Sequence, residues 1–118
     1  MTPNQTKETI LDKKQFEAFL LIYAAHIDYE FSDSEKVFIL ERTDPKTYEE
    51  MYAYFLDRGD YACMKILLKH KRIYYDTESE LDRIFTLLKS LFEVDGEYSR
   101  IEKSFVDFFK KMIDTEWI

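Results

Sequence analysis

Apolar residues recur at helical spacing along almost the whole chain. The first such segment, residues 16–27, is apolar on nearly all sides, which predicts a buried helix at the centre of the fold. Five further helices are expected, and they begin after Ser32, at Pro45, near Asp60, after Thr77 and at Ser99. The pattern therefore predicts helices joined by short turns.

These turns carry recognisable start and stop signals. Asp44-Pro45 places a favourable N-cap before a proline at the first helical position. Gly59 is expected to end that helix, and Asp60 to cap the next one. Thr77 to Glu80 has the spacing of a capping box, in which the two side chains bond reciprocally to the first backbone amides.

Together these elements predict an all-α fold. The chain has only two glycines and two prolines, so few residues are present to punctuate strands and hairpins. We expect a polar N-terminal leader over residues 1–11 and a single helical domain over residues 12–118. The domain would be one compact bundle of about six or seven helices containing two related helical hairpins.

Composition narrows the class of partner. The 118 residues are 46% hydrophobic and 17% aromatic, enough for a sizeable core, and the formal net charge is −7. Such a charge disfavours nucleic acid and anionic lipid and favours cations and basic protein surfaces. The longest mainly apolar run is about twelve residues, too short to span a bilayer. With a single cysteine and no secretory signal, the sequence predicts a cytoplasmic protein.

One phrase occurs twice, at residues 27–39 and 94–106. Each copy follows a long apolar helix and precedes the next helix. The alignment pairs Asp28 with Asp95, Glu30 with Glu97, Ser32 with Ser99, Glu35 with Glu102, and Lys36 with Lys103. Tyr29 stands where the second copy has Gly96, so either Tyr29 is strained in a left-handed conformation or the first turn differs.

Two interpretations of the repeat remain open. Ser32 with Glu35, and Ser99 with Glu102, both have capping-box spacing, and helix capping would explain these four residues. Capping does not require the two aspartates. If the two turns converge, their like charges would need a counter-ion, and carboxylate oxygens suit calcium, magnesium or manganese. Recruitment of His26 would favour zinc. The spacing does not match an EF-hand loop.

The two phrases resemble the acidic motif of the TerB-like tellurite-resistance family. The first reads Ala-His-Ile-Asp-Tyr-Glu-Phe-Ser-x-x-Glu from Ala25 to Glu35, and the second Val-Asp-Gly-Glu-Tyr-Ser-x-x-Glu from Val94 to Glu102. The resemblance extends over residues 16–112. It implies a cytoplasmic helical stress-response module that acts beside membrane-bound protein partners and binds a divalent metal ion at an acidic patch. Carried over by position, the motif carboxylates are Asp28, Glu35, Asp95 and Glu102, with Glu30 and Glu97 beside them. Tyr29 departs from the glycine of the motif.

Other polar residues carry weaker signals. We interpret His26 as a packed histidine, and His70, within the basic run of residues 69–72, as part of a solvated helix face. Cys63 is expected to be a structural thiol and Trp117 to fill the core.

No pairing of nucleophile and base is evident, so we expect a protein that is not an enzyme. The two functional hypotheses are a metal-binding stress module and a metal-free protein interaction module. The convergence of the acidic turns would distinguish them.

Overall fold

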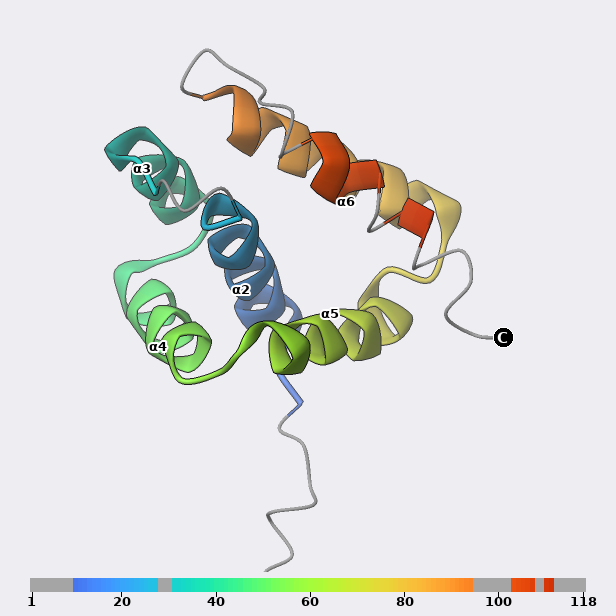
Figure 1. Cartoon of the computed structure of the whole chain (residues 1–118), viewed down its shortest axis with the longest axis horizontal. Coiled ribbons are helices and arrows are strands. Elements are labelled where there is room, and N and C mark those ends of the chain that lie inside the picture. Colours follow the sequence, from blue (N-terminus) through green and yellow to red (C-terminus); the bar gives the residue numbers. More distant parts are fainter. Residues whose placement is uncertain (1–9, 28–30, 95–102, 108–109, 112–118) are drawn as a thin grey trace, which may run out of the picture.

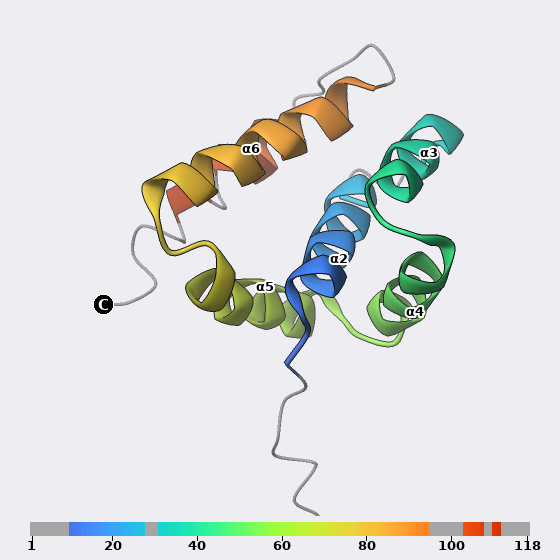
Figure 2. The same cartoon turned by 180° about the vertical axis from the view of Figure 1, so that it is seen from behind.

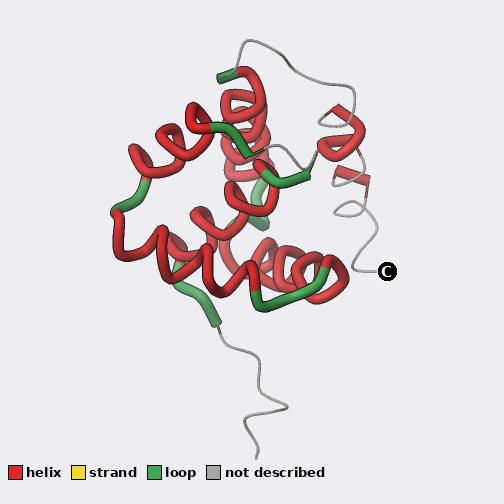
Figure 3. Tube along the Cα trace, turned by 60° about the vertical axis from the view of Figure 1, so that its left-hand side comes forward, coloured by secondary structure: helices red, strands yellow, loops and turns green. Residues whose placement is uncertain are grey.

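The computed structural model describes residues 10–27, 31–94, 103–107 and 110–111. Five labelled helices follow one another in Figure 1: α2 (Lys13–Ala25), α3 (Asp33–Arg42), α4 (Pro45–Leu56), α5 (Asp60–Tyr74) and α6 (Glu78–Glu93). A C-terminal helical segment includes residues 103–107 and 110–111. The described part of the chain contains no strand (Figure 3), so the predicted all-α fold is confirmed.

Helix α2 is the centre of the fold, as its apolar pattern predicts. It contacts α3, α4, α5 and α6, and it lies between α3 and α4 on one side and α6 on the other (Figures 1 and 2). All residues from Ala18 to Ala25 are buried, and Phe19, Ile22 and Ala24 have no exposed surface. An element surrounded by four others needs this all-round apolar character.

The C-terminal helical segment closes the core against α2 and α6. The ring of Phe105 lies 5.8 Å from that of Tyr23 and 6.3 Å from that of Phe92, measured between centroids. Phe105 and Val106 are both buried. The predicted last helix is therefore present over the described residues.

Side chains cap the helices largely where the sequence predicts. Ser32 precedes α3, Asp44 precedes α4 and Thr77 precedes α6, and each accepts a hydrogen bond from the backbone N–H three residues later. At α6 the expected capping box is only half formed, because the Glu80 carboxylate accepts from Arg83 and Lys13 instead. Asp12 and Gln15 form a full capping box at α2.

The predicted roles of Gly59 and Asp60 were wrong by one position. Helix α4 ends earlier, with Asp57 as its C-cap, and Gly59 is the N-cap of α5. The φ of Gly59 is −88°, an extended conformation and not the left-handed one that ends helices. Asp60 is the first helical residue, where its charge still favours the helix N-terminus.

The polar leader predicted for residues 1–11 contains a core residue. Leu11 is 2% exposed and belongs to the main hydrophobic cluster. Its carbonyl accepts a hydrogen bond from the hydroxyl of Tyr74 at 2.7 Å. Packing against the core therefore begins at least two residues before α2.

A polar cluster joins α2 to α6. The buried hydroxyl of Tyr75 donates to Glu17 Oε2 at 2.6 Å, and Arg83 of α6 pairs with the same oxygen. Burial, followed by the hydrogen bond to Glu17, raises the pKa of Tyr75 well above its ordinary value.

No helix in the described part of the chain is long and apolar enough to cross a membrane.

Candidate functional site

Of the six carboxylates predicted as metal ligands, Glu35 alone lies within the described residues. It occupies the third position of α3, where its backbone N–H donates to Ser32 Oγ at 3.1 Å. Glu35 Oε1 in turn accepts from the backbone N–H of Ser32, also at 3.1 Å. The predicted first capping box is therefore confirmed. The Glu35 carboxylate is nevertheless unusual for a cap, because the residue is only 1% exposed.

The other five predicted ligands, Asp28, Glu30, Asp95, Glu97 and Glu102, lie outside the described residues. The same is true of Tyr29 with its expected strain, of the second capping box at Ser99, and of Trp117. Their expected roles stay predictions. The structure does describe the residues that flank the two acidic turns.

Residues flanking the two turns lie together around one cavity between α3 and α6. Its volume is about 360 Å³. Val94, the C-cap of α6, comes directly before Asp95 in the chain, and Asp33 comes directly after Ser32. Both line the cavity, together with Ser34, Val37, Phe38 and Glu41 of α3. Residues of α3 from the first copy of the phrase, and Val94, which begins the second copy, therefore line the same cavity.

This cavity is lined by both apolar and acidic residues. Val37 is 52% exposed and Val94 is 39% exposed, although both are apolar. Of the residues that the structure describes, two charged ones line the cavity, Asp33 and Glu41, and both are acidic. Such an environment favours cations over anions. The described residues contain no group of three or more His, Cys, Asp or Glu side chains placed to hold a metal ion.

His26 is packed among aromatic rings at the end of α2. Its ring centroid lies 4.4 Å from that of Phe31, 4.8 Å from Phe55 and 5.6 Å from Tyr52. Nδ1 lies 2.7 Å from the carbonyl oxygen of Ile22. These contacts agree with the interpretation of His26 as a packed histidine.

The prediction of a solvated face at residues 69–72 was wrong for two of its members. His70 is fully buried and Lys71 is only 9% exposed. The helical spacing of the sequence did indicate a buried His70, since it lies seven residues after Cys63 and three after Leu67, both of which are core residues. The adjacent charges outweighed this periodicity in the sequence interpretation.

His70 of α5 forms a hydrogen bond with Leu11, which lies just before α2. Its Nε2 accepts a hydrogen bond from the backbone N–H of Leu11 at 2.9 Å, and its Nδ1 lies 2.8 Å from the carbonyl oxygen of Ile66. The imidazole also stacks on Phe16, with ring centroids 5.1 Å apart. The residue is therefore built into the core.

Cys63 is also buried, at 1% exposure. Burial, helped by the nearby Asp60, raises the pKa of the thiol. A raised pKa reduces the fraction of reactive thiolate, which suits a structural thiol.

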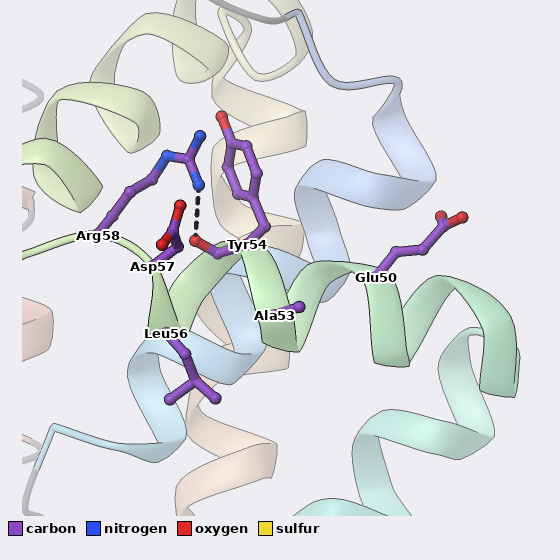
Figure 4. A pocket seen from close by; sticks show the side chains of 6 residues that line it. All are labelled: Glu50, Ala53, Tyr54, Leu56, Asp57 and Arg58. Atoms are coloured by element: carbon purple, nitrogen blue, oxygen red, sulfur yellow. Dashed lines mark hydrogen bonds between the residues drawn. The ribbon is translucent and has the colours of Figure 1, made fainter.

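A second hollow, which the sequence interpretation missed, lies at the end of α4 (Figure 4). Its volume is about 680 Å³, and it is lined by Glu50, Ala53, Tyr54, Leu56, Asp57 and Arg58. Arg58 donates to the Tyr54 carbonyl at 2.8 Å, and its guanidinium lies 3.5 Å from the centre of the Tyr54 ring. Leu56 is 63% exposed. The sequence places this apolar residue directly before the charged Asp57 and Arg58, and that pattern could have indicated an exposed hollow here. Because the hollow mixes both signs of charge, it indicates no particular ligand.

Comparisons with known proteins provide no relative: no family model, no curated protein and no solved structure matches this chain.

Proposed function

We propose that this protein is a non-enzymatic helical module that binds a divalent metal ion at the acidic end formed by its two repeated turns. One observation carries the proposal, namely that Asp33 and Val94, which flank different turns, line the same cavity. Val94 is the last described residue before the second turn, and Asp33 is the first residue of α3, so the described ends of both turns border this cavity. Convergence of the turns was the feature expected to separate metal binding from simple capping.

The chemistry of the proposed site follows from its donors. Asp28, Glu30, Asp95, Glu97 and Glu102 supply carboxylate oxygens, and the buried Glu35 supplies another. Carboxylates gathered at one place raise the free energy of one another's ionised forms, and a divalent cation relieves that repulsion. An oxygen-only donor set suits calcium, magnesium or manganese, whereas participation of His26 would suit zinc.

The resemblance to the TerB-like family supports the same proposal. Its acidic motif falls on these turns, and an all-helical domain is the fold that the resemblance implies. On this basis we propose a role in a stress response of the tellurite-resistance type, with protein partners.

Thermal unfolding of the metal-stripped protein tests the proposal. A bound ion raises the free energy of unfolding by about 2.7 kcal/mol when its concentration is 100 times the dissociation constant. We expect one of calcium, magnesium, manganese or zinc to raise the melting temperature selectively, and the Asp28→Asn/Asp95→Asn variant to lose this response. The matched control is Asp57→Asn/Asp82→Asn, which makes the same chemical change at two exposed positions elsewhere. Equal responses in both variants would contradict the assignment.

The alternative is a metal-free protein interaction module in which the turns only cap helices. Val37 and Val94 favour it, since both are exposed at the same cavity and apolar side chains exposed together mark interaction sites. The absence of a response to any ion would support this alternative.

A further inference from the structure

We propose that the cavity between α3 and α6 is a docking groove for a basic amphipathic helix of a partner protein. We call it the α3–α6 groove and define it by Asp33, Ser34, Val37, Phe38, Glu41 and Val94. The inference concerns a protein ligand and does not depend on a bound metal ion.

The order of residues along α3 defines the partner. Asp33, Val37 and Glu41 are four residues apart, so they lie along one face of α3. The two acidic residues are separated by about 12 Å, because an α-helix rises 1.5 Å per residue. The face therefore presents an acidic group, an apolar side chain and a second acidic group in a row.

A helix with the complementary order fits this face. An apolar side chain would pack on Val37 of α3 and Val94 at the end of α6, which both line the groove and are both exposed. A basic residue about one helical turn away on each side would reach Asp33 and Glu41. Amphipathic helices bind grooves between helices through anchors at such spacing. The protein's net charge of −7 also favours encounter with a basic partner.

The acidic groups of the groove are accessible. The Glu41 side chain is 68% exposed, and among the described residues it pairs with the neighbouring Arg42 at 3.8 Å. Arg42 is itself held elsewhere, since it donates to the Phe38 carbonyl at 3.0 Å and its guanidinium lies 3.5 Å from the centre of the Phe38 ring. A pair as long and exposed as Glu41 with Arg42 contributes little, so a partner's cation can replace it.

The probe is a labelled, alanine-based helical peptide with one leucine and an arginine about one turn away on each side. Its binding to metal-stripped protein is measured by fluorescence anisotropy in the presence of a chelator. We expect saturable binding that weakens about tenfold or more in Glu41→Lys, because the variant places a cation against the peptide's arginine. Val37→Ser should also weaken binding, since it removes the apolar anchor.

Matched controls separate the groove from general charge attraction. Glu49→Lys makes the same charge change at an exposed position on α4, and it should leave the affinity nearly unchanged. Replacing the leucine of the peptide by alanine should weaken binding. The proposal is overturned if the wild type does not bind the peptide, if Glu49→Lys weakens binding as much as Glu41→Lys, or if the alanine peptide binds equally well.

The same variants distinguish this inference from the proposed metal site. Glu41→Lys should keep the wild-type change in melting temperature with the selective ion, because Glu41 lies more than one turn beyond the capping box of α3. Loss of peptide binding with retention of the ion response would therefore assign the two activities to different residues. Loss of both activities in Glu41→Lys would overturn the assignment of Glu41 to the groove alone.

Discussion

His70 and Leu11, 59 residues apart in the chain, are joined by a buried hydrogen bond from the Leu11 N–H to His70 Nε2 at 2.9 Å. A backbone N–H can only donate, so Nε2 is unprotonated, and the proton of the neutral ring lies on Nδ1, facing the Ile66 carbonyl. The side chain thus satisfies a backbone group that precedes α2 and would otherwise be buried without a partner.

We predict that His70→Phe destabilises the protein although it keeps an aromatic ring against Phe16. The substitution removes the acceptor for the Leu11 N–H, and a buried donor without a partner costs about 1–3 kcal/mol. Urea denaturation should show a lower midpoint with an unchanged slope. An unchanged midpoint would show that the Leu11 N–H finds another acceptor.

Because its pKa is lowered in the folded state, Asp44 should make the protein less stable as the pH falls in the acidic range. Lys14 and the backbone N–H of Thr47 bind its carboxylate and lower its pKa from 3.8 to about 2. A lowered pKa in the folded state gives stability that is present above pH 3.8 and is lost as the pH falls towards 2. Asp44→Asn keeps an N-cap but does not titrate. The difference in free energy of unfolding between the wild type and this variant should therefore shrink as the pH falls from 3.8 towards 2. Denaturation midpoints across the interval, with the Asp44 pKa measured by NMR, check this; a pKa near 3.8 would contradict it.

Because its pKa is raised in the folded state, Tyr75 should make the protein less stable as the pH rises in the alkaline range. Its folded-state pKa is raised above 10, first by burial and then by the hydrogen bond to Glu17. The neutral phenol therefore stabilises the fold below pH 10, and this contribution is lost as the pH rises further. Tyr75→Phe should cost about 1–2 kcal/mol at neutral pH and flatten the alkaline loss of stability. Equal alkaline slopes for the wild type and Tyr75→Phe would refute the assignment.

Glu35→Gln separates capping from metal binding within a single residue. Glutamine serves at the third helical position of a capping box as glutamate does, so the box with Ser32 should survive. Without metal, Glu35→Gln should therefore be more stable than Glu35→Ala, which removes the acceptor for the Ser32 N–H and should lose about 1 kcal/mol. With the selective ion, Glu35→Gln should show a smaller rise in melting temperature than the wild type. A full rise would remove Glu35 from the ligand set.

Local signals in the sequence were sufficient for much of the fold. The apolar pattern of α2, the cap at Asp44 and the capping box at Ser32 each depend on residues within one or two helical turns, and each is present in the structure. Gly59 was misassigned because glycine suits both the end of one helix and the N-cap of the next, and only the backbone angle distinguishes them.

Long-range contacts were less accessible to sequence reasoning. The charges beside His70 favoured a solvated face, whereas the fold brings Leu11 over that position and buries it. The α3–α6 groove also depends on packing, since no local pattern predicts that Val94 lies near Val37.

Direct measurement of bound ions tests the central claim most simply. Metal-stripped wild type and the Asp28→Asn/Asp95→Asn variant would each be titrated calorimetrically with calcium, magnesium, manganese and zinc. The proposed site predicts saturable binding of one of these ions by the wild type and loss of that binding in the variant. Absence of saturable binding by the wild type, or equal binding by the variant, would contradict a metal site at the repeated turns.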